Sequence, residues 1–274
     1  GVSLAVAAVP EGLPAILAVV LALGVQRMAT RRAIVRHLAA VETLGSATVI
    51  ASDKTGTLTR NEMTVRRIVT ASGSVHVGGT GYEPVGTLET DGGGPVEGDV
   101  QREILRALTA ADRVNNATIR EQDGRWLVQG DPTEGALIVA ARKVGLQPAD
   151  LDAHFPRVAE IPFSAERKLM TTVHRGDGAD SEFSAFIKGA PDVLLALCSH
   201  ELTGESVVAL SDARRTEIGQ ANDALAGEAL RTIGVAVRMI PASPSPGEYR
   251  SEDLEHDLTF LGLIGMIDPP RDEA

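Results

Sequence analysis

The chain has 274 residues, 43% of them hydrophobic and 23% charged, which allows a substantial core and excludes a disordered or collagen-like chain. Lys and Arg total 26 against 37 Asp and Glu, so the net charge is −11, and we expect no nucleic-acid partner. A single cysteine, Cys198, excludes an internal disulfide framework and a cysteine-based zinc site. Because the chain begins at Gly1 rather than Met, we expect it to be a piece of a longer protein.

A slightly basic head precedes an acidic body. Residues 1–60 carry a net charge of +3, whereas residues 61–260 carry −12. In the head, residues 1–25 are apolar except for Glu11, and as a helix rising about 1.5 Å per residue they would be long enough to cross a bilayer. The apolar run is followed by arginines, as on the cytoplasmic side of a span: Arg27, Arg31, Arg32 and Arg36. We therefore predict a transmembrane helix over 1–25; the alternative is a buried helix of a soluble protein.

Two prolines interrupt this predicted helix around Glu11, in the sequence Pro-Glu-Gly-Leu-Pro. Pro10 and Pro14 each leave a carbonyl of the preceding turn without its helical partner, and in hydrocarbon such carbonyls need protein, water or an ion. With the Glu11 carboxylate they form hard oxygen ligands suited to Ca²⁺ or another hard cation. The segment predicts a cation site; the alternative is a proline kink with Glu11 snorkelling or protonated.

The next predicted elements are a helical stalk over 33–44 and a short buried parallel strand over 47–51. Asp53 lies just past the carboxyl end of that strand, where open α/β sheets bind their ligands. We expect Asp53 to be a nucleophile that forms an aspartyl phosphate. Gly56 allows close backbone approach. Further side chains of the same loop can donate to phosphate oxygens: Lys54, Thr55 and Thr57.

The sequence DKTGTLT at residues 53–59 resembles the phosphorylation motif of the P-type ATPases. The upstream PEGLP and the segment VETLGSATVIASDKTGTLTRNEMTV resemble the type II, calcium-pump-like branch of that family. The resemblance implies an α/β fold, in which an α+β nucleotide-binding domain is inserted into a haloacid-dehalogenase-like phosphorylation domain, preceded by one transmembrane helix. It also implies ATP and Mg²⁺ as cofactors, with Asp53 accepting the γ-phosphate and Mg²⁺ held by Asp53 and the main-chain carbonyl of Thr55. The implied ligands of the transported cation are Glu11 and the carbonyls of Val6, Ala7 and Val9.

The acidic body reads as strands, glycine turns and helices. No GxxxxGK[ST] phosphate-binding loop occurs in it, so ATP would need another arrangement. The predicted elements are a strand over 64–69, a turn at 78–81, a loop at 92–95, a helix over 100–115, a helix that starts within 130–137 and a surface loop over 241–247.

Three short segments carry aromatic or cationic residues that could hold a nucleotide: 163–168, 186–192 and 229–236. Taken alone, each is better explained by an ordinary surface lysine or core phenylalanine. Together with GDPTEGAL, the segments PFSAERKLM and KGAPD resemble the P-type ATPase nucleotide domain in content and order. Two positions depart from that pattern, namely Ala165, which is basic in animal calcium pumps, and Asp192, which is usually glutamate. The resemblance implies that Phe163 stacks on adenine, Glu134 lies near the adenine amino group, Lys168 and Lys188 line the pocket and Arg231 contacts phosphate.

The tail returns to apolar strand character and ends in DPPR, which resembles the point where the family's chain re-enters the phosphorylation domain. Asp268 and Arg271 would be hinge or pocket residues, although Asp268 could equally be a structural cap. The expected parts are therefore a transmembrane helix (1–25), stalk and first phosphorylation segment (26–60), nucleotide-binding domain (61–260) and a truncated return (261–274).

These features together predict the central part of an ATP-driven cation pump in the cell membrane, with its nucleotide and phosphorylation domains in the cytoplasm. The expected partners are Ca²⁺ (with Mn²⁺ or Na⁺ possible), membrane lipid and the remaining domains of the parent chain. No GDGxN segment is present to supply a second carboxylate for Mg²⁺, so we expect the fragment alone to be inactive. The alternatives are a haloacid-dehalogenase-type phosphatase, which typically has an aspartate where Thr55 stands, and a nucleotide-binding regulatory module, which would not need Asp53.

Overall fold

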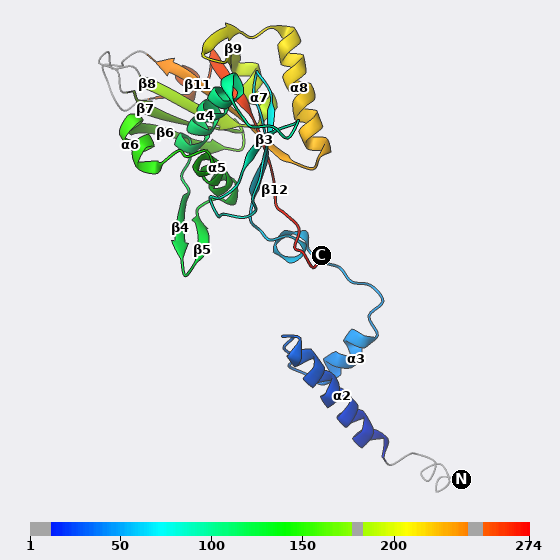
Figure 1. The fold of residues 1–274 in the computed structure, drawn as a ribbon. Helices are drawn as coiled ribbons and strands as arrows, with labels where there is room; N and C mark the ends of the chain where they lie inside the picture. Colours follow the sequence, from blue (N-terminus) through cyan, green and yellow to red (C-terminus); the bar gives the residue numbers. More distant parts are fainter. Residues whose placement is uncertain (1–11, 177–182, 241–248) are drawn as a thin grey trace. The chain divides into compact units, whose positions relative to one another are not determined.

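A computed structural model describes residues 12–176, 183–240 and 249–274 (Figure 1). The chain divides after Asp53 into two units, Gly1–Asp53 and Lys54–Ala274, which are described separately. Some predicted features lie outside the described residues: the loop over 241–247 and the cation ligands Val6, Ala7, Val9 and Glu11.

The first unit contains helices α2 (Leu13–Thr30) and α3 (Ala39–Gly45). By length and composition, α2 is the one helix in the described part of the chain that could cross a membrane, and none of its residues is buried. It ends at Thr30 rather than at residue 25. The predicted stalk over 33–44 is helical only from Ala39.

The predicted strand over 47–51 is wrong. These residues have no regular secondary structure, and the side chains of Val49 and Ile50 are 82% and 90% exposed. A β-branched run favours a strand, but a strand forms only where a neighbouring strand pairs with its backbone groups. No strand in the described segments pairs with residues 47–51.

The second unit is built on a ten-stranded mixed sheet in the order β3-β2-β1-β12-β11-β8-β7-β6, with β9 beside β12 and β10 beside β9. Every pair is antiparallel except β9 with β12, which is parallel. The strands are β1 (Thr64–Val69), β2 (Ser74–Val77), β3 (Leu88–Thr90), β6 (Arg157–Ser164), β7 (Leu169–Arg175), β8 (Phe183–Gly189), β9 (Cys198–Thr203), β10 (Ser206–Ala209), β11 (Arg231–Ile240) and β12 (Leu258–Ile267).

Helices cover both faces of this sheet (Figure 1). On one face, α4 and α5 pack in a core with Phe186 of β8, and on the other, α7 and α8 pack with Ile187. Neighbouring strand residues point to opposite faces, so β8 is buried on both sides and reads as one apolar run. The helices are α4 (Gly98–Arg113), α5 (Pro132–Lys143), α6 (Pro148–His154), α7 (Pro191–Leu197), α8 (Asp212–Gly227) and α9 (Ser251–Leu254). A separate hairpin, β4 (Thr118–Gln122) and β5 (Arg125–Gln129), projects next to α5.

Most elements predicted for the acidic body are confirmed. The strand over 64–69 is β1, the helix over 100–115 is α4, the helix starting within 130–137 is α5, and the loop at 92–95 follows β3. The hairpin predicted at 78–81 is present, since β2 and β3 pair antiparallel, but residues 78–81 are only the first part of a longer connection between the two strands. Because β12 lies between β1 and β11, the expected domain boundary at residue 260 falls inside a central strand of the sheet.

Candidate functional site

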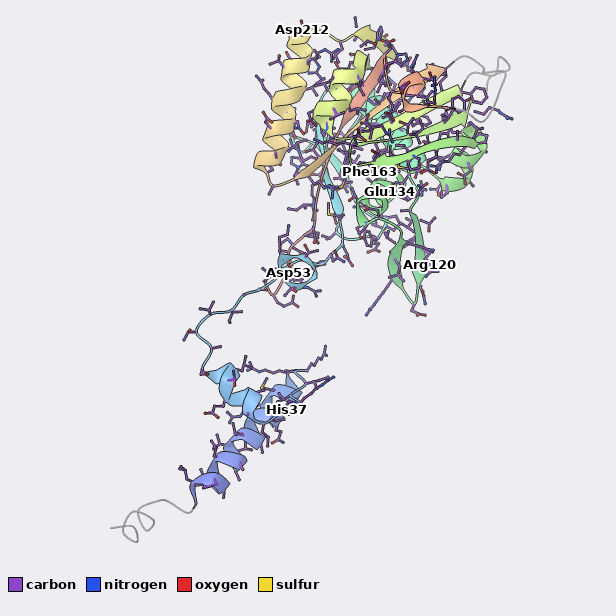
Figure 2. The ribbon with its side chains drawn as sticks, turned by 180° about the vertical axis from the view of Figure 1, so that it is seen from behind. His37, Asp53, Arg120, Glu134, Phe163 and Asp212 are labelled. Carbon is purple, nitrogen blue, oxygen red and sulfur yellow. The ribbon has the colours of Figure 1, made fainter. Side chains whose placement is uncertain are left out.

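A cavity of about 500 Å³ lies beside the N-terminus of α5, the turn between β6 and β7, the end of β8 and the start of β11. Its volume is in the range of small-molecule sites. Figure 2 shows Phe163 and Glu134 next to one another at this place. The cavity brings together the nucleotide residues predicted from separate segments: Glu134, Phe163, Lys168, Lys188 and Arg231.

Glu134 is placed by the start of α5. Asp131 caps this helix, since its carboxylate Oδ1 accepts hydrogen bonds from the backbone amides of Thr133 (2.7 Å) and Glu134 (3.4 Å). Pro132 occupies the first helical turn, where its missing amide hydrogen costs nothing. Gly135 lets the helix approach β5, because a Cβ there would lie 2.4 Å from Val128. The helix start therefore fixes the Glu134 side chain at the wall of the cavity.

Lys188 and Glu134 form a buried ion pair in the cavity. The distance from Lys188 Nζ to Glu134 Oε1 is 2.7 Å, and Lys188 is only 7% exposed. Burial lowers the pKa of Lys188, and the hydrogen bond and charge of Glu134 oppose that change. Glu134 Oε2 also accepts a hydrogen bond from the backbone amide of Asn116 at 3.1 Å. Both charged groups are thus held in place before any ligand arrives.

Phe163 and Lys168 lie on either side of the turn that connects β6 to β7. The Phe163 side chain is 61% exposed, and Lys168 has a left-handed backbone with φ of 55°. This turn lies against the end of β8, where the Ala190 amide donates to the Lys168 carbonyl at 3.1 Å. A Cβ on Gly189 would lie 2.1 Å from that carbonyl oxygen, so only glycine permits the contact.

The cavity also offers groups without a protein partner. Among the described residues, the Lys168 and Arg231 side chains have no hydrogen-bond or ion-pair partner, and Thr232 Oγ1 is a buried hydroxyl oxygen without a hydrogen bond. An exposed aromatic ring next to two free cations suits a ligand with a planar base and phosphate groups. Several lining residues were not predicted individually, although each lies in a segment that the sequence singled out, namely GDPTEGAL, PFSAERKLM or 229–236: Asp131, Thr133, Met170, Thr232 and Ile233.

Asp268 and Arg271 lie away from the cavity. Asp268 Oδ2 accepts a hydrogen bond from Thr59 Oγ1 at 2.5 Å, and its Oδ1 accepts from the Glu62 amide at 3.2 Å. The Arg271 guanidinium donates to the carbonyls of Gly56 (3.0 Å) and Thr59 (3.1 Å). Neither residue lines the cavity, and the hinge role of both and the capping role of Asp268 stay predictions.

The predicted phosphorylation loop is exposed. Asp53 closes the first unit, and Lys54–Leu58 begins the second with Gly56 in the left-handed region at φ of 76°. The described residues contain no group of three or more His, Cys, Asp or Glu that could hold a metal. Asp53 offers a carboxylate and Thr55 a main-chain carbonyl, and oxygen donors of this kind are the ligands that Mg²⁺ prefers.

The structure is an α/β domain with a cavity that gathers an exposed aromatic ring and several cationic side chains. Residues 103–273 match the family model described as P-type ATPase, cytoplasmic domain N. The chain belongs to the P-type ATPase family, as its motifs indicated.

Relatives cover the whole of this chain. It is 44% identical over 274 residues to "Calcium-transporting ATPase" of Bacillus subtilis, covering 100% of this chain and 30% of the relative. It is 42% identical over 273 residues to "Probable cation-transporting ATPase F" of Mycobacterium tuberculosis, covering 100% and 29%. For "Calcium-transporting ATPase type 2C member 1" of Bos taurus the values are 43% over 273 residues, 98% and 26%. The chain thus spans less than a third of the length of these relatives.

Proposed function

We propose that this chain is the central part of an ATP-driven cation pump, in which ATP bound in the cavity phosphorylates Asp53. The observation that carries the proposal is the cavity itself. It gathers five side chains from four segments of the chain, and the resemblance of these segments, taken together, to the P-type ATPase nucleotide domain implies a nucleotide contact for each side chain.

Each side chain has a distinct proposed part in holding ATP. The exposed Phe163 ring stacks on adenine, a contact that needs only a flat apolar face. Glu134 accepts a hydrogen bond from the adenine amino group. Lys188, whose charge is neutralised by Glu134, lines the cavity. Lys168 and Arg231 meet the phosphates, which compensates for the negative field of an acidic domain.

In the proposed reaction, a carboxylate oxygen of Asp53 attacks the γ-phosphorus of ATP. A bond forms between that oxygen and phosphorus, the bond to the bridging oxygen breaks, and ADP leaves with the electron pair. Lys54, Thr55 and Thr57 donate hydrogen bonds to the phosphoryl oxygens. Mg²⁺, held by Asp53 and the Thr55 carbonyl, supplies positive charge that offsets the charge on the phosphates.

The remaining parts of the proposal are supported by family membership alone. Residues 26–60 and the tail belong to a haloacid-dehalogenase-like phosphorylation domain, and the residues between them form the inserted nucleotide domain, here extended to include β12. The N-terminal apolar helix spans the membrane among lipids, with the cytoplasmic domains on its arginine-rich side.

Ca²⁺ is the proposed cargo, with Mn²⁺ or Na⁺ as alternatives, since two relatives are named calcium-transporting. The proposed ligands of this cation are Glu11 and the carbonyls of Val6, Ala7 and Val9. The rest of the pump supplies the missing catalytic groups, so the fragment alone is inactive.

The test is phosphoenzyme formation by the full-length protein. We expect radiolabel from [γ-³²P]ATP to appear as an acid-stable, hydroxylamine-labile adduct in the presence of the transported cation, tried as Ca²⁺, Mn²⁺ and Na⁺. Asp53→Asn abolishes it, because an amide cannot attack phosphorus. Asp272→Asn is the control, since the Asp272 side chain is 86% exposed and its ion pair is with Arg60. Persistent labelling of the Asp53→Asn protein would refute the proposal, and ATP binding without any labelling would favour a regulatory module.

A further inference from the structure

The turn that carries Phe163 and Lys168 lies at an edge of the sheet, where the strand ladder constrains it weakly. Strand β6 is the last in the sheet order, and among the described strands it pairs only with β7. The register of that pair shifts between Ile161, opposite Thr171, and Ser164, opposite Leu169. Two residues of β6, Pro162 and Phe163, therefore face a single residue of β7, as in a bulge. Strand pairing alone therefore does not fix the position of the Phe163 ring, and another contact must fix it.

Arg167 supplies a link from this turn to the body of the domain. Its Nη2 donates to the carbonyl oxygen of Pro162 at 2.5 Å, directly before Phe163, and its backbone amide donates to Ser164 Oγ at 3.3 Å. Its Nη1 forms an ion pair with Glu255, a residue 88 positions away in the sequence. One guanidinium thus joins the backbone next to Phe163 to a distant carboxylate.

Glu255 is itself held firmly. Its side chain is 7% exposed and also accepts a hydrogen bond from Thr171 Oγ1 at 2.8 Å. It follows α9, whose Leu254 is buried in a core cluster. The α9 backbone is also held by Arg238, whose guanidinium donates a hydrogen bond to the Asp253 carbonyl at 2.9 Å. The Glu255 carboxylate is therefore an anchor, and Arg167 transmits its position to the turn.

We propose that Arg167 and Glu255 are positioning residues for the nucleotide. Their ion pair holds the bulged end of β6 so that the Phe163 ring and Lys168 face the cavity before ATP binds. This inference rests on the proposed ATP site but adds residues outside it, since neither side chain lines the cavity. Preorganising the ring and the cation lowers the conformational cost of binding.

The test uses the full-length protein and equilibrium displacement of trinitrophenyl-ATP by ATP. Glu255→Gln keeps an acceptor for Thr171 but removes the charge that holds Arg167. We expect its ATP dissociation constant to rise about tenfold, the equivalent of about 1.4 kcal/mol, as for loss of a charged hydrogen bond. Arg167→Gln should raise it equally, and the double variant should add nothing further because the two residues act through one pair. The rate of phosphorylation at saturating ATP should stay within about twofold, because the contacts of the bound phosphates are retained.

A matched ion pair separates positioning from general stability. Arg214 and Glu201 are buried to a similar degree, 29% and 4% exposed, but lie between α8 and β9, away from the cavity. We expect Glu201→Gln to lower the melting temperature as much as Glu255→Gln does, with ATP affinity unchanged. Equal ATP affinity of wild type and the Glu255→Gln and Arg167→Gln proteins would overturn the inference. If Phe163→Ala also leaves affinity unchanged, the proposed ATP site itself fails; if Phe163→Ala weakens binding, only the positioning role fails.

Discussion

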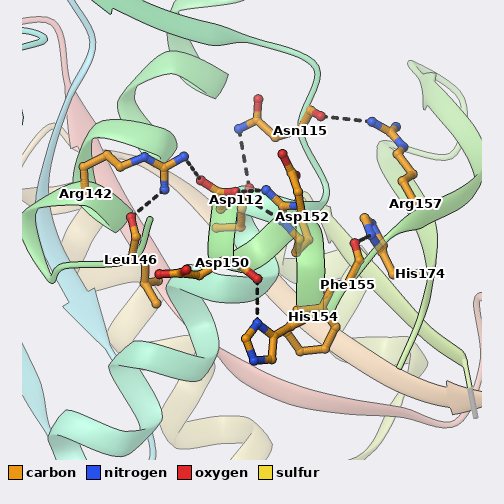
Figure 3. Close-up of polar contacts among 12 residues, drawn as sticks. Asp112, Asn115, Arg142, Leu146, Asp150, Asp152, His154, Phe155, Arg157 and His174 are labelled. Atoms are coloured by element: carbon orange, nitrogen blue, oxygen red, sulfur yellow. Dashed lines mark hydrogen bonds and ion pairs between the residues drawn. The ribbon is translucent and has the colours of Figure 1, made fainter. Parts of the chain in front are cut away.

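At the scale of single residues, His174 is a buried imidazole whose ring contacts the Phe155 carbonyl (Figure 3). It is 1% exposed, with Nδ1 2.8 Å from the Phe155 carbonyl and Nε2 3.0 Å from Thr172 Oγ1. Burial lowers the pKa of His174 to about 4, the Phe155 hydrogen bond opposes this, and the charges of Arg113 and Arg157 add to it. The His174 imidazole therefore resists protonation in the folded chain but not in the unfolded chain.

This residue predicts a loss of stability in mild acid. Above pH about 6.5, His174 is neutral in both folded and unfolded chains and has no effect. As the pH falls toward 4, only the unfolded chain takes up the proton, so the free energy of unfolding should drop by about 3 kcal/mol, at about 1.4 kcal/mol per pKa unit. The measurement is the urea midpoint of the 274-residue chain from pH 7.5 to 4. His174→Gln should flatten that pH dependence; equal slopes for wild type and His174→Gln would contradict the argument.

At the scale of elements, two helices begin with side-chain caps of the same kind but in different places. Asp131 caps α5 at the cavity, and Ser211 caps α8, where its Oγ accepts from the Arg214 amide at 3.2 Å. Both satisfy amides that a helix start otherwise leaves unpaired. Only the first cap fixes a side chain, Glu134, that the proposed ATP site uses.

We expect Asp131→Ala and Ser211→Ala to cost similar stability, about 1 kcal/mol each. Their effects on ATP should differ, because fraying of the α5 start displaces Glu134 from the cavity whereas fraying of α8 displaces nothing there. Asp131→Ala should raise the ATP dissociation constant several-fold, and Asp131→Ser, which restores a cap, should recover most of the affinity. Paired melting curves and ATP displacement titrations measure both effects. If Ser211→Ala weakens ATP binding as much as Asp131→Ala does, the effect is one of global stability.

The sequence predicted those features whose cause is local. Asp131, Pro132 and the apolar residues that follow predict the start of helix α5. Lys188 is indicated by the glycine that follows it, which lets β8 approach the turn. Features that depend on the order of strands in the sheet could not be predicted from the sequence. The link from Arg167 to Glu255 exists only because the fold brings α9 to the β6–β7 turn. Residues 47–51 have strand composition, but no strand in the described part of the chain pairs with them.

At the scale of the whole second unit, its two ends run side by side. The Arg60 amide donates to the Pro269 carbonyl at 3.0 Å, and the Arg271 amide donates to the Leu58 carbonyl at 2.8 Å. Each end continues into a central strand, the first into β1 and the second into β12, and these two strands pair directly. The loop that follows Asp53 is therefore joined to the middle of the sheet, whose next strand, β11, begins with Arg231 at the cavity.

Asp268 is the side chain that closes this join, since it accepts from both Thr59 Oγ1 and the Glu62 amide. We expect Asp268→Ala to speed amide hydrogen exchange over residues 54–62 by about tenfold or more, because losing a charged acceptor costs about 1.5–3 kcal/mol locally. ATP affinity should not change, because the cavity is built from other segments, whereas phosphorylation of Asp53 in the full-length protein should slow as its loop loses order. Asp272→Ala, which removes only an exposed ion pair with Arg60, should leave both exchange and phosphorylation unchanged. An Asp268→Ala protein with wild-type exchange over 54–62 would show that the backbone bonds between the two ends suffice without the carboxylate.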